Sequence, residues 1–290
     1  METAAPDAAA HSLGELLAAG AAWLSRRGVD DARLQCEWLA ADIMHCRRTA
    51  LPLDAVPEPD TVAALRAGIV RLANGEPLQY VLGNWDFRAL TLATDHRALI
   101  PRPETEGLVA LVLDEPRLWD AAPLICDVGT GTGAIALSLA HERPQCRVMA
   151  TDCEGAALSL ARENAERLGL AGRVIFVLGR NCAEAEPGSL DAVVSNPPYI
   201  ASATVDALPR HIRDFEPRTA LDGGADGLDI IRSLVHDAAI ALRRGGFIFL
   251  EIGDDQGEAV LALLEGAGFS EAAILKDLAG LTRYAKGRIE

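Results

Sequence analysis

Apolar positions in the first part of the chain follow a helical repeat. Three such segments cover residues 12–27, 30–45 and 60–73, with the three- and four-residue spacing that gathers apolar side chains on one helix face. Ser12 followed by Glu15 is a capping-box pattern, so Ser12 is the expected N-cap of the first helix. Asn74-Gly75 ends the third segment. The pattern predicts a small helical domain over residues 1–82.

After residue 82 the apolar positions change to short runs typical of strands. Phe87–Leu92 and Ala98–Ile100 predict a linking β-hairpin over residues 83–101. Pro101-Arg102-Pro103 then stiffens the start of a helix that runs through Leu113.

Beyond residue 120, apolar runs alternate with helical segments. The expected strands cover residues 124–128, 147–151, 174–178, 191–195 and 247–252, and the expected helices begin at 133, 154, 228 and 256. Two last runs, residues 270–276 and 281–288, predict a hairpin at the sheet edge. Such alternation predicts an α/β fold over residues 102–290, a mostly parallel seven-stranded sheet with helices on both faces.

Composition narrows the class of protein. Of 290 residues, 50% are hydrophobic and 24% charged, which is typical of a globular protein. The formal net charge of −15 disfavours direct nucleic-acid binding, because affinity for a duplex comes largely from neutralising its phosphates. The six cysteines form no C-x-x-C pair and the six histidines show no ligand spacing, so we expect reduced thiols and no metal. Met1–Ala10 carries no basic leader, and no uncharged apolar run reaches the ~18 residues of a membrane span; we expect no membrane partner and a cytoplasmic location.

A glycine-rich segment, Asp127-Val128-Gly129-Thr130-Gly131-Thr132-Gly133, joins an expected strand to an expected helix. Small residues there allow a ligand to approach the backbone at a helix N-terminus, which predicts a nucleotide-cofactor loop. Gly129-x-Gly131-x-x-Ala134 also satisfies the dinucleotide fingerprint, so an NAD-binding module and a simple tight turn remain alternatives. Asp152 ends the next strand, where a carboxylate binds ribose hydroxyls or caps the following helix.

Ser195-Asn196-Pro197-Pro198-Tyr199 follows the fourth expected strand. The two prolines restrict the backbone, so that the side-chain carbonyl of Asn196 and the main-chain carbonyl of Pro197 converge beside the flat ring of Tyr199. Two acceptors beside an aromatic ring suit a planar amino group whose lone pair is delocalised. Such a nitrogen attacks only when it is held in line with an electrophilic carbon, so positioning is the expected catalytic device. The alternative is a rigid loop without chemistry.

The glycine loop and the Asn196–Tyr199 segment together resemble class I S-adenosylmethionine-dependent methyltransferases that act on planar amino groups. Four longer segments resemble, more narrowly, the HemK/PrmC-type protein-(glutamine-N5) methyltransferases. They are Gly75–Tyr80, Leu99–Glu106, Gly129–Leu137 and Phe215–Leu221. The resemblance extends over nearly the whole chain.

The resemblance implies a Rossmann-like methyltransferase domain and a helical domain that helps to dock the substrate. It implies methylation of the glutamine side-chain nitrogen (N5) in the Gly-Gly-Gln motif of class 1 peptide chain release factors. The residues that it assigns to S-adenosylmethionine are Asp127, Gly129, Thr130, Gly131, Thr132, Gly133, Asp152, Asn181 and Asn196. Those that it assigns to the glutamine amide are Asn196, Pro197, Pro198 and Tyr199, with Asn196, Pro197 and Tyr199 catalytic. Arg102, Thr105 and Glu106 would line the methionine end of the cofactor.

One position departs from the family pattern. Where the family commonly has an acid near the adenine, this chain has Arg180, so Asn181 is left to contact the base. Two other substrates also remain open, since adenine-N6 DNA or RNA methyltransferases share Asn-Pro-Pro-Tyr and a glutamine of another protein would fit the same site chemistry.

Overall fold

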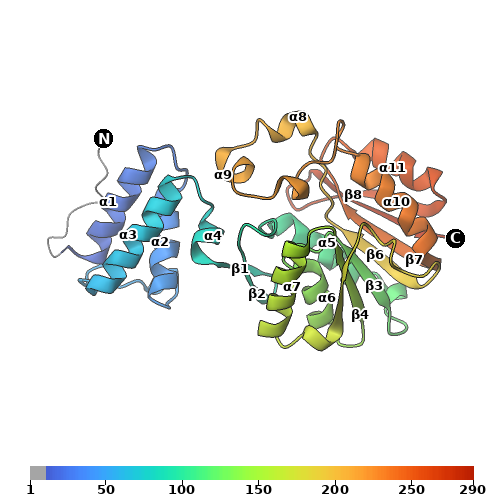
Figure 1. The fold of residues 1–290 in the computed structure, drawn as a ribbon, viewed down its shortest axis with the longest axis horizontal. Helices are drawn as coiled ribbons and strands as arrows, with labels where there is room; N and C mark the ends of the chain where they lie inside the picture. Colours follow the sequence, from blue (N-terminus) through green and yellow to red (C-terminus); the bar gives the residue numbers. More distant parts are fainter. Residues whose placement is uncertain (1–10) are drawn as a thin grey trace. The chain divides into compact units, whose positions relative to one another are not determined.

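The chain folds into two compact units (Figure 1), and the computed structural model describes residues 11–290. The smaller unit extends to Gly83 and also contains Arg210–Phe215, whereas the larger contains Asn84–Pro209 and Glu216–Glu290. Residues 1–10, on which the expected lack of a leader rests, lie outside the described residues. The predicted linking hairpin is part of the larger unit, and a distant segment joins the helical one.

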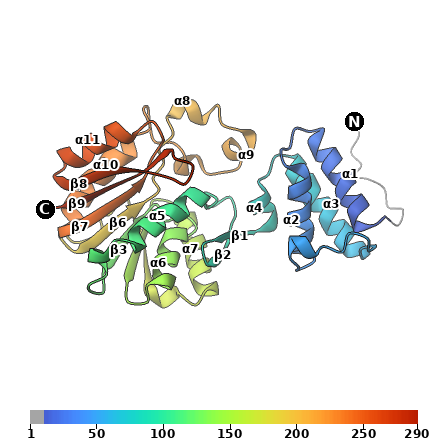
Figure 2. The ribbon, with the colours of Figure 1, turned by 180° about the vertical axis from the view of Figure 1, so that it is seen from behind.

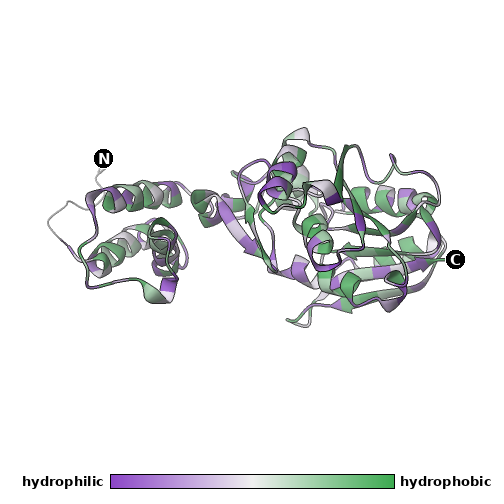
Figure 3. Ribbon diagram, turned by 90° about the horizontal axis from the view of Figure 1, so that it is seen from below, coloured by the Kyte–Doolittle hydropathy of each residue, from purple (hydrophilic) through white to green (hydrophobic). Residues whose placement is uncertain are grey.

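The smaller unit is helical, as predicted. Its elements are α1 (Leu13–Ser25), α2 (Ala32–Ile43), the 3-10 helix η1 (Arg48–Ala50), α3 (Pro59–Ala73), α4 (Leu78–Leu82) and α9 (Arg210–Arg213). The capping box is confirmed, because Ser12 Oγ accepts from Glu15 N (3.3 Å) and Glu15 Oε2 accepts from Ser12 N (2.9 Å). Figure 3 shows green apolar and purple polar residues alternating along these helices. Their apolar faces form one core that includes fully buried Leu13, Leu17 and Leu24.

The hairpin of the larger unit is shorter than predicted. It consists of β1 (Asn84–Phe87) and β2 (Leu90–Ala93), paired antiparallel and joined by a turn in which Arg88 has φ +52°. The prediction of a strand at Ala98–Ile100 is wrong. There, Ile100 N donates to Glu216 Oε2 at 3.1 Å, so this segment pairs with a distant side chain instead of a neighbouring strand.

The seven-stranded sheet is confirmed. Its strands are β3 (Leu124–Val128), β4 (Arg147–Asp152), β5 (Val174–Leu178), β6 (Leu190–Ser195), β7 (Leu242–Glu251), β8 (Phe269–Lys276) and β9 (Thr282–Ile289). The spatial order is β5-β4-β3-β6-β7-β9-β8. The pairs from β5 to β7 are parallel, and β9 is antiparallel to both β7 and β8. The terminal hairpin therefore completes one edge of the sheet, as expected.

Helices cover both faces of this sheet (Figures 1 and 2). One face carries α5 (Pro103–Leu113), α6 (Ala134–Glu142) and α7 (Gly155–Arg167), and the other carries α10 (Asp229–Ala241) and α11 (Gly257–Gly266). The short elements are η2 (Pro116–Leu118), η3 (Ala171–Arg173), α8 (Ser202–Val205) and η4 (Arg218–Ala220). Along β3, Ile125 packs into the core beneath α5, α6 and α7, and Cys126 packs into the core beneath α10 and α11. The central strands are thus covered on both faces, which explains why they are continuous apolar runs. Among the described residues, no helix has the length and apolar character needed to cross a bilayer.

Candidate active site

Strand register brings the predicted site residues to one edge of the sheet. Val128 of β3 pairs with Thr151 of β4 and Ser195 of β6, and Ser195 in turn pairs with Leu250 of β7. The residues that follow these positions are Gly129, Asp152, Asn196 and Glu251. Asp152 and Glu251 are the last residues of β4 and β7, and Gly129 and Asn196 come directly after β3 and β6. All four therefore lie at the carboxyl end of the sheet, which is where open α/β folds bind their ligands.

The glycine loop is a strand-to-helix turn with open space above it. Gly129, Gly131 and Gly133 all have positive φ, and Gly129 N and Thr130 N both donate to Thr151 O, at 2.9 and 3.0 Å. At Gly133 a side chain would also meet Leu137 Cδ1 at 2.9 Å, whereas nothing lies within 4 Å of the position a Cβ would take at Gly129. The backbone is therefore the surface that Gly129 offers to a ligand.

Asp127 holds this loop from inside. Its Oδ2 accepts from Thr130 Oγ1 (2.7 Å) and from Ala136 N (3.0 Å), and its Oδ1 has no hydrogen-bond partner among residues 11–290. Burial raises the pKa of this carboxyl to about 7, because a low-dielectric interior disfavours the charged form. Thr132 is also buried, and its carbonyl accepts from Asn164 Nδ2 (2.9 Å). These contacts fix the shape of the loop.

Asp152 connects the glycine loop to the start of α7. Its Oδ2 accepts from Gly131 N (3.0 Å) and its Oδ1 from Glu154 N (2.9 Å). Burial raises its pKa, against the lowering effect of the two backbone N–H groups. Because an ionised carboxylate has about four acceptor positions, each oxygen retains capacity for a further donor. Asp152 thus contacts the start of α7, which is one of the two roles expected for it. Its oxygens also keep free acceptor positions for ribose hydroxyls.

The residues after β5 lie next to Asp152, since Gly179 N donates to Asp152 O at 3.0 Å. Arg180 is exposed. The side-chain nitrogen of Asn181 donates to Ser233 Oγ (2.8 Å) and Asp237 Oδ2 (2.7 Å). This amide group is therefore anchored to α10, and a contact of Asn181 with adenine stays a prediction.

The Asn-Pro-Pro-Tyr loop starts beside the glycine loop and is held at both ends. Ser195 Oγ donates to Val128 O (2.7 Å), and Asn196 Nδ2 donates to Thr105 Oγ1 (3.0 Å). At the other end, the Tyr199 hydroxyl donates to Glu251 Oε1 (3.3 Å). Burial and the nearby Glu251 raise the pKa of Tyr199 to about 12, so its hydroxyl stays protonated.

The loop also has a backbone support that the sequence did not lead us to expect. Gln256 Nε2 donates to Tyr199 O (2.9 Å) and to Gly227 O (3.2 Å). A side chain at Gly223 would come within 2.7 Å of Pro198 O, and one at Gly227 would overlap Tyr199 O. The signals that could have indicated this support are Glu251-x-Gly253-x-x-Gln256 and the glycines of 223–227.

The three residues expected at the methionine end of the cofactor have different partners. Thr105 lies against Asn196, and Arg102 pairs with Glu216 at 2.5 Å. Glu106 Oε1 accepts from Arg88 N at 2.9 Å. Of the three, only Thr105 is joined to the Asn-Pro-Pro-Tyr loop by a hydrogen bond.

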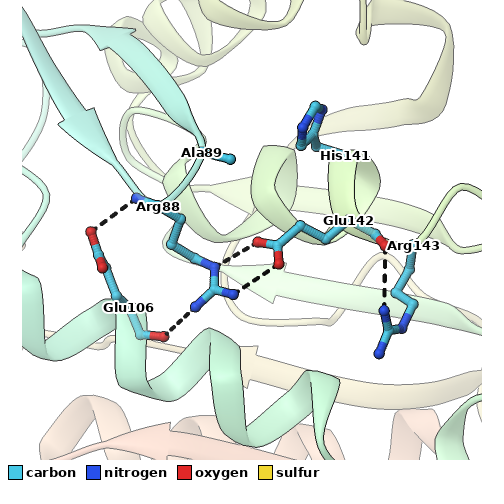
Figure 4. Close-up of a pocket in the computed structure, with 6 residues that line it drawn as sticks. All are labelled: Arg88, Ala89, Glu106, His141, Glu142 and Arg143. Atoms are coloured by element: carbon cyan, nitrogen blue, oxygen red, sulfur yellow. Dashed lines mark hydrogen bonds and ion pairs between the residues drawn. The ribbon is translucent and has the colours of Figure 1, made fainter.

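A separate pocket of about 460 Å³ lies where the hairpin turn meets α5 and α6 (Figure 4). Its lining residues are Arg88, Ala89, Glu106, His141, Glu142 and Arg143. Arg88 donates to both Glu142 oxygens, at 2.6 and 2.8 Å, and to Glu106 O at 3.1 Å. Because its main charges are paired with one another, this pocket ties the hairpin to the two helices and offers little to a ligand.

The resemblance implies S-adenosylmethionine at the glycine loop, and the residues fit that group. The space above Gly129 admits a ligand against the backbone, and Asp152 retains acceptors for the ribose. Asn196 adds a side-chain oxygen at the same edge of the sheet. Among the described residues, no group of His, Cys, Asp or Glu is arranged to hold a metal ion.

Comparisons with known proteins match both parts of the chain. Residues 109–213 match the Methyltransferase small domain and residues 15–83 the PrmC N-terminal domain. A methyltransferase structure from Pyrococcus furiosus shares the fold, with a TM-score of 0.51 at 20% identity, covering 69% of this chain and 88% of that one.

Full-length relatives are closer in sequence. The release factor glutamine methyltransferase of Moorella thermoacetica is 44% identical over 263 residues, which cover 90% of this chain and 92% of the relative. That of Deinococcus radiodurans is 41% identical over 281 residues, covering 95% and 98%. On the evidence of these relatives and of the two matched domains, the chain belongs to the release factor glutamine methyltransferase family.

Proposed function

We propose that this enzyme transfers the methyl group of S-adenosylmethionine to the side-chain amide nitrogen of the glutamine in the Gly-Gly-Gln motif of class 1 peptide chain release factors. The observation that carries the proposal is the orientation of Asn196. Its nitrogen is bound to Thr105, so its oxygen is the atom left to accept from a substrate amide. Asn196 follows Ser195, the last residue of β6, which pairs in register with Val128, the last residue of β3 before the glycine loop.

The reaction needs positioning more than proton transfer. The cofactor supplies an electrophilic methyl group, whose bond to sulfur breaks as the bond to nitrogen forms. Asn196 Oδ1 and the Pro197 carbonyl accept the two amide N–H groups, and Tyr199 packs against the amide plane. Positive charge develops on the attacking nitrogen, so these two acceptors stabilise the transition state more than the ground state. The nitrogen then loses a proton to solvent, leaving a neutral methylated amide.

Several observations favour a protein substrate over a nucleic acid. The chain has a net charge of −15, and the arginines near residue 214 are paired with acids. Arg210 and Arg213 both contact Asp214, and Arg218 contacts Asp206 and Asp222. Paired arginines have less capacity to neutralise phosphates. We assign the docking of the release factor to the helical unit, which matches the PrmC N-terminal domain.

The proposal is tested by methyl transfer from labelled S-adenosylmethionine to a full-length release factor. A factor with Gly-Gly-Ala in place of Gly-Gly-Gln is the matched control, and an adenine-containing oligonucleotide is assayed in parallel. We expect label only in the intact motif, and a kcat roughly 10²-fold lower for Asn196→Ala, comparable to the loss of one transition-state hydrogen bond. Label in the oligonucleotide alone would assign the enzyme to the adenine class, and label in the Gly-Gly-Ala factor would move the modified residue elsewhere.

A further inference from the structure

Asn196 is the first member of a buried hydrogen-bonded series that extends beyond the Asn-Pro-Pro-Tyr loop. Asn196 Nδ2 donates to Thr105 Oγ1 (3.0 Å), and Thr105 Oγ1 donates to Glu251 Oε2 (2.8 Å). The other oxygen of Glu251 accepts from the Tyr199 hydroxyl (3.3 Å). Thr105 is 5% exposed and Glu251 1% exposed, so water does not readily replace these partners. The series joins α5 and β7 to both ends of the Asn-Pro-Pro-Tyr loop.

The direction of each hydrogen bond follows from chemistry. Burial raises the pKa of Glu251 to about 7, and above this pH its carboxylate is ionised and only accepts hydrogen bonds. The Thr105 hydroxyl then uses its single proton toward Glu251. Its lone pairs then accept from Asn196, which must present its NH₂ group to Thr105. The oxygen of the Asn196 amide is thereby turned away from Thr105, and no donor from residues 11–290 is bonded to it.

Without Thr105, nothing in this series distinguishes the two ends of the Asn196 amide. A rotation by 180° would replace the acceptor with an NH₂ group, which repels the N–H groups of an incoming amide. The orientation of a side-chain amide is set by its hydrogen-bond partners, and here the partner set is Thr105 backed by Glu251.

We propose that Thr105 and Glu251 are positioning residues that orient the Asn196 amide, so that its oxygen faces the substrate nitrogen. This inference rests on the proposed function, in which Asn196 accepts from the glutamine amide. Through its second oxygen, Glu251 also holds the Tyr199 ring that packs on the same group. The Glu251 carboxylate thus fixes both the orientation of the Asn196 amide, through Thr105, and the position of the Tyr199 ring.

Two substitutions at residue 105 separate the hydroxyl from the rest of the side chain. Thr105→Val keeps the shape and removes the hydroxyl, whereas Thr105→Ser keeps the hydroxyl and is the matched control. We expect Thr105→Val to lower kcat roughly 10–100-fold, approaching the loss of one catalytic hydrogen bond. The KM for the release factor should stay within about threefold, and the kcat of Thr105→Ser should lie within about threefold of the parent value.

A double-mutant cycle tests whether Thr105 acts through Asn196. If it does, Thr105→Val should change kcat by less than about twofold in an Asn196→Ala background, because residues of one network are not additive. Losses that multiply in the double variant, or equal losses for Thr105→Val and Thr105→Ser, would overturn the inference.

A spectroscopic measurement keeps this inference separate from the proposed function. In protein labelled with ¹⁵N at asparagine, the side-chain resonance missing in Asn196→Ala identifies the Asn196 amide. We expect one of its protons to be shifted by its hydrogen bond in the parent and in Thr105→Ser, and to lose that shift in Thr105→Val. A release factor that is not methylated would refute the proposed function alone. An Asn196 resonance that is identical in all three proteins would refute the positioning role, whatever the substrate.

Discussion

Replacing Asp152 with alanine should weaken binding of S-adenosylmethionine strongly while leaving the fold intact. The Asp152 carboxylate already accepts from Gly131 N and Glu154 N, at 3.0 and 2.9 Å. Each oxygen retains room for one more donor, and the two hydroxyls of a ribose match that capacity. Asp152 is 9% exposed, so these hydrogen bonds would form in a poorly hydrated place.

The magnitude follows from the number of bonds removed. A hydrogen bond to a charged group contributes about 1.5–3 kcal/mol, and two of them at the lower end give about 3 kcal/mol. Because each 1.4 kcal/mol is tenfold in affinity, Asp152→Ala should raise Kd by roughly 10²-fold. Asp152→Asn keeps one side-chain oxygen and should raise Kd by roughly tenfold.

The assay is calorimetric titration of the protein with S-adenosylmethionine, accompanied by urea unfolding of each variant. Glu154→Ala is the matched control, since it removes an exposed negative charge two residues away and should leave Kd within about twofold. A Kd for Asp152→Ala equal to that of the parent, together with a lowered stability, would refute the reasoning. Asp152 would then only hold the backbone N–H groups of the loop and of α7.

Three further predictions concern the support of the site. Gly227→Ala should displace Tyr199 and lower kcat more than roughly tenfold, because Gly227 has φ +77° and a methyl group there would overlap Tyr199 O. A steady-state methylation assay measures kcat, and an unchanged value would contradict this prediction. Glu216→Ala should lower the free energy of unfolding by about 2–3 kcal/mol, because the buried carboxylate accepts from Arg102 and from Ile100 N. Urea titration measures the free energy of unfolding, and a loss below ~0.5 kcal/mol would contradict this prediction. Burial raises the pKa of Glu251 from 4.5 to about 7, so its ionisation destabilises the folded protein progressively as pH rises through this range. Glu251→Gln has no such cost, and its stability relative to the parent should increase by about 3 kcal/mol between pH 4.5 and pH 8; a relative stability independent of pH would refute the assignment.

The central sheet was predictable from the sequence because its strands are short apolar runs with clear ends. Leu124–Val128 and Val174–Leu178 are strands with the predicted bounds, and the glycine loop and Asp152 lie at the predicted edge. In these segments the local pattern and the tertiary structure agree, since a strand covered on both faces must be apolar throughout.

The supports of the site could not be predicted, because they join residues far apart in the chain. Thr105 and Glu251 are 146 positions apart, and Ile100 and Glu216 are 116 apart. The segment before Pro101 has a strand-like composition, yet its backbone N–H at Ile100 is bonded to a carboxylate. The periodicity of apolar positions in a single sequence does not indicate which distant side chain will accept a hydrogen bond from a given backbone N–H group.

The return of the chain to the helical unit at Arg210–Phe215 limits how this enzyme can be divided. Gly75 lies against Arg210 and Phe215, about 3.6 Å from each at the position that a Cβ would take. A truncation that begins at Asn84 would keep every residue of the sheet but would leave these six residues without the helices on which they pack. We expect such a fragment to be cleaved by proteases between Pro209 and Glu216, since exposed segments without packing partners are preferred cleavage sites. The helical unit therefore supports the packing of a segment that follows the Asn-Pro-Pro-Tyr loop, and removing this unit would leave that segment exposed.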